Sequence, residues 1–273
     1  MKVKNLVKPY MIWSMILIIL PLVMIALYSV VTKDDSLLSF NFTLDNFIKI
    51  GDPVYVKVIV KSLAVGALVT LICLVISYPL ALFITRTSEK TGSILILFLT
   101  IPMLINTLLR TYAWISLLSE HGIINAALKS IGIARQNMIY NNFSVMIGLV
   151  CDLLPFMVIP IHTAMAKMDV NLIDAAYDLG ANKLQVITRV IFKMSLPGVI
   201  SGCISVFIFS ISEFVVPELL GGHQFVLIGN LIENQFISIG DWNFGSALGI
   251  LLVVLIIALA IVLRKTDRGD NND

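Results

Sequence analysis

Long apolar stretches separated by short polar connections dominate the pattern of the chain. Six of them are long enough to cross about 30 Å of hydrocarbon as helices. A hydrophobic fraction of 58%, a charged fraction of 13% and a mean hydropathy of +0.97 exclude a soluble globular protein. The pattern therefore predicts an all-α membrane protein in which residues 1–273 form one transmembrane domain. The predicted spans are approximately Met11–Val31, Ser62–Ile84, Ile94–Leu118, Phe143–Met165, Gly198–Leu220 and Phe244–Leu263.

The distribution of lysine and arginine predicts the orientation of these spans. With the N-terminus in the cytoplasm, twelve of the nineteen basic residues fall in the inner segments. The positive-inside rule therefore places both termini in the cytoplasm of a multi-pass protein of the cell (inner) membrane. The three cysteines, Cys73, Cys151 and Cys203, lie inside spans without metal-ligand spacing, so we interpret them as packing residues and expect no metal site.

The connection from Asp169 to Pro197 is the longest stretch with mixed charge and helical periodicity. It predicts two short helices hinged at Gly180, a residue that suits the left-handed position after a helix. We expect Asn171 to cap the first helix, and Asn182, with Gln185 three residues later, to cap the second. On this orientation the connection lies in the cytoplasm.

The residue order in this connection resembles the signature loop of the permease subunits of binding-protein-dependent ABC importers. That loop has Glu-Ala-Ala, three residues and then glycine, and here the pattern reads Asp174-Ala175-Ala176 followed by Gly180. Asp174 replaces the usual glutamate, and Lys193 stands where the family often has a proline. The resemblance implies a type I ABC importer permease fold with six transmembrane helices. It also implies that residues 169–197 form a coupling loop docked on a cytoplasmic ATPase through Asp174, Ala175, Ala176, Gly180 and Ala181. An ordinary amphipathic cytoplasmic loop is the alternative.

Two further stretches resemble the polyamine (spermidine/putrescine) branch of these permeases. One is Arg-Thr-Tyr-Ala-Trp at residues 110–114, and the other is Phe-Val-Val-Pro-Glu-Leu-Leu-Gly-Gly at residues 214–222. The similarity is strong across the third predicted span and from Asp152 to Gly249, and faint in the first hundred residues. It implies that the importer carries polyamines. Within the same family, a permease for another small cationic or organic solute is the alternative.

Two acidic residues, Asp152 and Glu213, lie inside predicted spans, where an ionisable side chain is costly and indicates function or a buried partner. On straight helices, Asp152 lies near the midplane, Arg110 about 24 Å from the inner end of its span, and Glu213 about 22 Å along the fifth span. Carboxylates and aromatic rings in a partly dry cavity suit a flexible polycation. Alternatively, Arg110 and His162 neutralise the acids as contacts between helices, and the aromatic residues belong to an outer interfacial belt. The candidate substrate-pathway residues are Asp152, Glu213, Tyr112, Trp114, Arg110, Glu218 and Trp242.

The chain has no G-x-x-x-x-G-K-[ST] phosphate-binding loop and no His-Glu-x-x-His motif. We therefore expect a transport subunit rather than an enzyme, with no cofactor bound by this chain. The family resemblance implies a complex in the lipid bilayer with a second homologous permease, two ATPase subunits that hold ATP and Mg, and an extracytoplasmic polyamine-binding protein. No nucleic-acid partner is expected.

Two other classes of protein remain open. A secondary transporter or channel would account for six spans and intramembrane acids, but it gives no reason for the Ala-Ala and Gly pattern of the loop. An intramembrane enzyme would need paired catalytic groups at one depth, which the sequence does not clearly offer.

Overall fold

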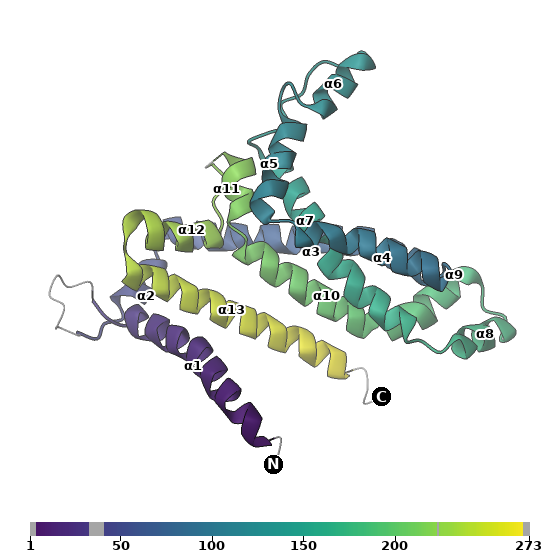
Figure 1. Ribbon diagram of the computed structural model, residues 1–273, viewed down its shortest axis with the longest axis horizontal. Helices are drawn as coiled ribbons and strands as arrows, with labels where there is room; N and C mark the ends of the chain where they lie inside the picture. Colours follow the sequence, from purple (N-terminus) through teal and green to yellow (C-terminus); the bar gives the residue numbers. More distant parts are fainter. Residues whose placement is uncertain (1–3, 33–40, 223, 270–273) are drawn as a thin grey trace.

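The computed structural model describes residues 4–32, 41–222 and 224–269, and this part of the chain is almost entirely helical (Figure 1). Five of its helices are long and apolar enough to cross a membrane, and a bent pair provides a sixth crossing if it is counted as one span. The prediction of an all-α, multi-span protein is confirmed. The helices are α1 (Lys4–Ser29), α2 (Asp45–Ile50), α3 (Pro53–Thr85), α4 (Glu89–Leu104), α5 (Thr107–Leu118), α6 (Ile123–Ser130), α7 (Asn142–Ala166), α8 (Val170–Asp178), α9 (Lys183–Gln185), η1 (Val186–Ile191), α10 (Phe192–Ser212), α11 (Val215–Gly221), α12 (Ile228–Asn234), η2 (Gln235–Ile239) and α13 (Trp242–Gly269).

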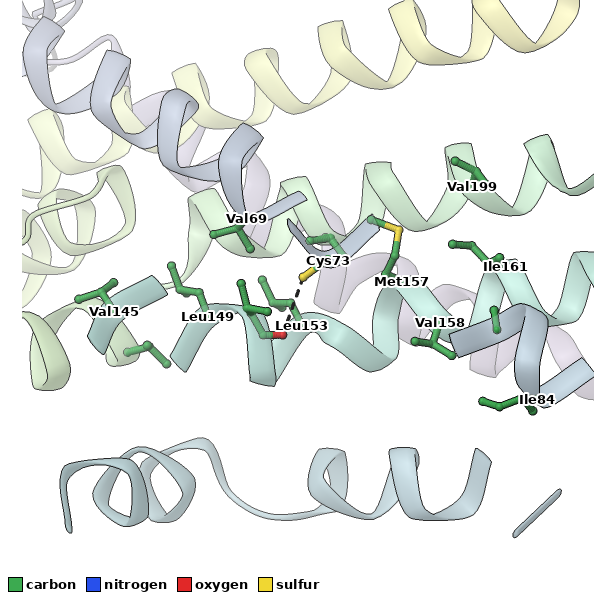
Figure 2. Packing of buried hydrophobic residues seen from close by; sticks show 14 of the residues in the cluster. Val69, Cys73, Ile84, Val145, Leu149, Leu153, Met157, Val158, Ile161 and Val199 are labelled. Carbon is green, nitrogen blue, oxygen red and sulfur yellow. Dashed lines mark hydrogen bonds between the residues drawn. The ribbon is translucent and has the colours of Figure 1, made fainter. Parts of the chain in front are cut away.

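Helix α7 forms the centre of the bundle because it packs against both α3 and α10. Several of its apolar side chains, among them Leu149 and Met157, are fully buried. Figure 2 shows them beside Val69 and Cys73 of α3, where the Cys73 thiol donates to the backbone carbonyl of Val150 at 3.8 Å. Helix α1 lies at the edge of the bundle along α13. Cys73 is thus a buried packing residue, as predicted, whereas Cys151 is exposed and Cys203 is half-buried.

The close approach of α7 and α10 depends on two glycines at small-xxx-small spacing. A Cβ atom added to Gly198 would lie 2.5 Å from the carbonyl oxygen of Pro160, and one added to Gly202 would lie 2.7 Å from the sulfur of Met157. Gly249 of α13 lies in a similar small-xxx-small pair, but it has room for a side chain. A Cβ atom there would lie 4.0 Å from its nearest neighbour, the Cγ2 of Ile25.

Replacing Gly198 with valine should force α7 and α10 apart and lower the stability of the membrane domain. Overpacking of this kind costs about 1–3 kcal/mol, so the purified protein should inactivate at a temperature several degrees lower in a thermal-melt assay. Gly249→Val is the matched control and should shift the melt little, because a side chain has room there. Equal decreases in the inactivation temperature of the two variants would show that the α7–α10 contact does not determine the thermal stability of the protein.

The predicted third span, Ile94–Leu118, is not one straight helix. Helix α4 ends at Leu104, the helical path resumes at Thr107, and the two parts are bent by 97°. The break is local in origin: Pro102 lies in the last turn of α4, and the Asn106 side chain caps α5 by accepting from the backbone N–H of Leu108 at 2.8 Å. Figure 1 shows α5 and α6 leaving the direction of α4. A depth calculated for Arg110 from a straight helix is therefore wrong.

The fifth spanning helix begins earlier than predicted. It starts at Lys183 and continues without interruption through the π-helical segment η1 into α10, as far as Ser212. Pro197 lies inside this helix. The prediction of a short second helix in a loop that ends at Pro197 is therefore wrong, because no cap or left-handed residue stops the chain after Lys183.

The same helix also ends earlier than predicted. Glu213 is extended (φ −68°, ψ 133°), and its carboxylate accepts a hydrogen bond from the backbone N–H of Val215 at 3.0 Å. This turn separates α10 from α11, so the predicted span Gly198–Leu220 is divided between two helices. Glu213 consequently lies at a helix break and not within a continuous span.

In Figure 1, α1 runs away from the side on which α8 lies, and α13 runs back toward that side. These opposite directions agree with the prediction that both ends face the compartment of the Asp169–Pro197 connection. The terminal residues 1–3 and 270–273 are outside the described part of the chain.

Candidate functional site

The connection between α7 and α8 and the turn after α8 form a tightly bonded unit. Asp169 caps α8 by accepting from the backbone N–H of Asn171 at 3.0 Å, so the expectation that Asn171 is the cap was wrong. At the other end, Asn182 and Gln185 exchange side-chain to backbone hydrogen bonds of 2.9 Å, and this predicted capping box is confirmed. The two caps fix where α8 begins and where the next helix starts.

Gly180 has φ +80°, in the left-handed region that the sequence predicts for it. The N–H of Gly180 bonds the carbonyl of Tyr177 at 2.9 Å, and the N–H of Ala181 bonds the carbonyl of Ala176 at 3.0 Å. This pair of bonds is the Schellman arrangement that closes a helix. Gly180 and its neighbours therefore set the angle at which the chain leaves α8.

The predicted coupling residues divide between an exposed and a half-buried set. Asp174 and Ala175 are exposed, whereas Ala176 and Ala181 pack against the main core. Four exposed apolar side chains that the sequence analysis did not select lie on the same unit, and Leu179 is 90% exposed. An apolar surface of this kind in a polar segment indicates a contact with another protein. These side chains are Leu172, Tyr177, Leu179 and Leu184.

A second cluster lies inside the membrane bundle, where α5, α7 and the end of α10 meet. Arg110 of α5 forms an ion pair with Asp152 of α7, with 3.3 Å between Nη2 and Oδ2, and both side chains are largely buried. Glu213 lines the same cavity, which has a volume of about 240 Å³. The other lining residues are Met103, Thr107, Leu153, Phe156 and Phe209.

The guanidinium of Arg110 is held by one nitrogen. Nη2 donates to the hydroxyl of Thr107 at 3.2 Å and faces Asp152, while Nε is buried without a hydrogen-bond partner. Charge-assisted hydrogen bonds are commonly 2.7–2.9 Å long, and arginine often forms two in parallel with a carboxylate. The Arg110–Asp152 pair is therefore long and uses a single donor.

Two aromatic rings form a wall of this cavity. The centroids of Phe156 and Phe209 are 4.6 Å apart, with their planes at 54°. Each ring lies four residues from an acid, Phe156 after Asp152 and Phe209 before Glu213, so helical spacing from the acids could have identified both. Neither ring was among the predicted site residues.

The remaining candidate residues lie elsewhere. Glu218 lines a separate cavity of about 550 Å³ and lies 3.4 Å from the side-chain amide of Asn230. Trp242 packs against Tyr28 and Phe236. Tyr112 is exposed, and Trp114 packs against the core. The seven predicted pathway residues thus do not form one site.

The structure also places His162 and Glu233 relative to the acidic residues of the predicted site. His162 lines an inner cavity with Glu89, away from the acids, so neutralisation of Asp152 or Glu213 by His162 does not occur in this structure. Glu233, which the sequence analysis did not select, lines the cavity that contains Glu218. Within residues 4–32, 41–222 and 224–269, no three His, Cys, Asp or Glu side chains are grouped so that they could hold a metal ion.

Known proteins resemble this chain in both sequence and fold. The spermidine/putrescine transport system permease protein PotB of Escherichia coli (strain K12) is 38% identical over 259 residues, which cover 94% of each chain. The protein of the same name from Haemophilus influenzae is 35% identical, over 94% of this chain and 91% of its own. A chain of the bacterial alginate ABC transporter, solved in complex with an alginate pentasaccharide-bound periplasmic protein, superposes with a TM-score of 0.77. It is 17% identical, and the match covers 99% of this chain and 95% of that chain.

A family model also matches nearly the whole chain. It is described as the binding-protein-dependent transport system inner membrane component, and it matches residues 2–268. The match includes the segment around Gly180 and all the predicted spans. The chain therefore belongs to the family of inner membrane components of binding-protein-dependent transport systems, with the type I ABC importer permease fold.

Proposed function

We propose that this protein is the membrane-spanning permease subunit of an ATP-driven importer of polyamines such as spermidine and putrescine. The observation that carries the substrate class is the 38% identity, over 94% of each chain, to a spermidine/putrescine permease. The intramembrane cavity between α5, α7 and α10 supports the same substrate class through its chemistry.

The cavity suits an aliphatic ammonium group. Asp152 and Glu213 supply two carboxylates to one cavity, and an ammonium has three N–H donors with which to pair with them. The rings of Phe156 and Phe209 offer apolar walls for the methylene chain and π faces for its charge. In this proposal Asp152 and Glu213 bind substrate during its passage, while Glu218, Trp242, Tyr112 and Trp114 lie along its outer approach.

The unit around α8 is the proposed contact with the ATPase. Its exposed surface combines Asp174 and Ala175 with the apolar side chains of Leu172 and Leu179. The complex would contain a second homologous permease, two ATPase subunits that bind ATP and Mg, and an extracytoplasmic polyamine-binding protein. ATP hydrolysis then occurs on the partner subunits, and this chain transmits their motion to its spans.

Replacing Leu179 with aspartate should weaken binding of the ATPase, because the apolar side chain is 90% exposed and would bury in the contact. Loss of a buried leucine contact costs about 1.5–3 kcal/mol, so at least a tenfold reduction in co-purified ATPase is expected. Ile237→Asp is the matched control, since Ile237 is also exposed (76%) but lies in η2, after α12. If Leu179→Asp retains the ATPase as well as Ile237→Asp does, the α8 unit is not the docking surface.

The substrate class can be tested by whole-cell uptake. Bacteria without polyamine uptake of their own would express this chain with its transport partners, and labelled putrescine would be offered together with an excess of unlabelled competitors. The proposal predicts strong competition by spermidine and putrescine, and little by arginine or a neutral sugar. Absence of labelled putrescine uptake, or stronger competition by arginine or another cationic or organic solute than by spermidine, would keep the family and replace the substrate.

A further inference from the structure

The cavity that contains Asp152 and Glu213 also contains a cation of the protein itself. Arg110, Asp152 and Glu213 give it a formal net charge of −1, from one guanidinium and two carboxylates. The guanidinium faces Asp152 at 3.3 Å. Among the described residues, no lysine or arginine lies within ion-pair distance of Glu213. Asp152 is therefore paired with a protein cation, whereas Glu213, whose Oε1 accepts from the backbone N–H of Val215, has no cation beside it in the described part of the chain.

The contact between Arg110 and Asp152 is suited to exchange. It uses one guanidinium nitrogen, which is shared with the Thr107 hydroxyl, and it leaves Nε of Arg110 buried without a partner. Asp152 and Glu213 line the same cavity, whereas the guanidinium is within ion-pair distance of Asp152 alone. An ammonium has three N–H donors, so a ligand ammonium that pairs with both acids satisfies more of the carboxylate oxygens than Arg110 does.

The volume of the cavity limits the size of the group that can enter together with a ligand ammonium. A volume of about 240 Å³ corresponds to about eight water molecules at ~30 Å³ each. That is enough room for an ammonium and a short methylene chain along Phe156 and Phe209. A bare metal cation carries no apolar stem and would leave these rings without contact.

The position of Arg110 connects this exchange to the bend of the chain. Arg110 lies in the first turn of α5, four residues after the cap Asn106 and directly after the 97° break. Asp152 lies on the central helix α7. Release of Arg110 from Asp152 therefore removes an ionic contact that fixes the start of α5 to the core of the bundle.

We propose that Arg110 is a built-in competitor for the substrate ammonium: it occupies Asp152 when the cavity is empty and is displaced when an aliphatic ammonium bridges Asp152 and Glu213. This inference rests on the proposed function, because it takes the polyamine as the ligand. It makes Arg110 a specificity-determining residue. A ligand must bind Asp152 more strongly than the guanidinium does. An aliphatic ammonium that also contacts Glu213 meets that condition.

The test is direct binding of tritiated spermidine to the complex of this chain with its second permease and ATPase subunits in lipid nanodiscs, without the binding protein. Arg110→Gln and Arg110→Met should each bind spermidine about tenfold more tightly than the unchanged complex, because the competing charge is gone. Arg110→Lys keeps a competing charge and should tighten binding by less than about threefold. Arg135→Gln is the matched control, because Arg135 pairs with Glu120 at 3.5 Å on the exposed outer connection.

A purely structural role for Arg110 gives the opposite result. Weaker or unchanged spermidine binding in Arg110→Gln and Arg110→Met would overturn the competitor role, and so would a complex that fails to assemble with either variant. If the unchanged complex imports spermidine and these variants bind it no more tightly, only the inference about Arg110 fails. If the unchanged complex imports no polyamine, the proposed function fails with it.

Discussion

Replacing Gly180 with valine is expected to uncouple transport from ATP hydrolysis. Gly180 has φ +80°, and a Cβ atom there would meet nothing within 4 Å, so the variant acts through its backbone and not through a clash. The left-handed conformation costs an L-residue about 1–2 kcal/mol, and a β-branched side chain is a poor occupant of it. The chain should relax by changing the angle after α8, and ATP-dependent uptake should fall at least about tenfold.

The protein contains its own matched control for this variant. Gly132 has φ +81° and likewise nothing within 4 Å of a Cβ atom, but it lies in the connection between α6 and α7. Gly132→Val therefore introduces the same local strain away from the α8 unit and should retain most of the uptake. Gly180→Asn should also retain activity, since asparagine tolerates the left-handed region. Equal losses in Gly180→Val and Gly132→Val would mean that general destabilisation explains the effect.

Asp152→Asn should nearly abolish uptake. The substitution removes the only ion-pair partner of Arg110 among the described residues and one of the two carboxylates that line the cavity. Breaking a buried ion pair by removal of one partner commonly costs about 3–5 kcal/mol, because the remaining charge stays buried. In addition, the released guanidinium repels a substrate cation. Uptake by proteoliposomes, normalised to the amount of assembled complex, should fall on the order of 100-fold or more.

The control for this second variant is Glu120→Gln, which removes the carboxylate of the exposed pair with Arg135. Exposed ion pairs contribute about 0–1 kcal/mol, so uptake should stay close to that of the unchanged protein. Glu213→Gln is expected to reduce uptake less than Asp152→Asn, because no buried cation loses its partner. Full uptake by Asp152→Asn would remove this cavity from the substrate pathway.

The parts of the structure that follow from local rules could be predicted from the sequence. The left-handed Gly180 and the capping box of Asn182 and Gln185 are set by residues within a few positions, and both are confirmed. The number and type of the spans follow from hydrophobic length, and the fold agrees. Asn171 was the wrong cap because Asp169, two residues earlier, offers a carboxylate to the same turn.

The parts that depend on tertiary packing could not be predicted. Apolar residues on both sides of the break at Ile105 and Asn106 conceal it, because hydrophobicity continues while the helix direction changes by 97°. The Arg110–Asp152 pair depends on that bend, so a straight-helix depth placed the arginine too far from the aspartate. Likewise, the short turn at Glu213 ends a helix inside an apolar run. Helical spacing places Phe156 and Phe209 on the same faces as the acids, but their contact with each other becomes evident only when α7 and α10 are side by side.

We propose that this chain carries polyamines inward at the expense of ATP hydrolysed by its partners. The most direct measurement is uptake of labelled spermidine and putrescine into proteoliposomes that contain this chain, its second permease and the ATPase, with the binding protein outside and ATP inside. We expect uptake that requires ATP and the binding protein and that is lost in Gly180→Val. Uptake that proceeds without ATP and responds only to an ion gradient would contradict it.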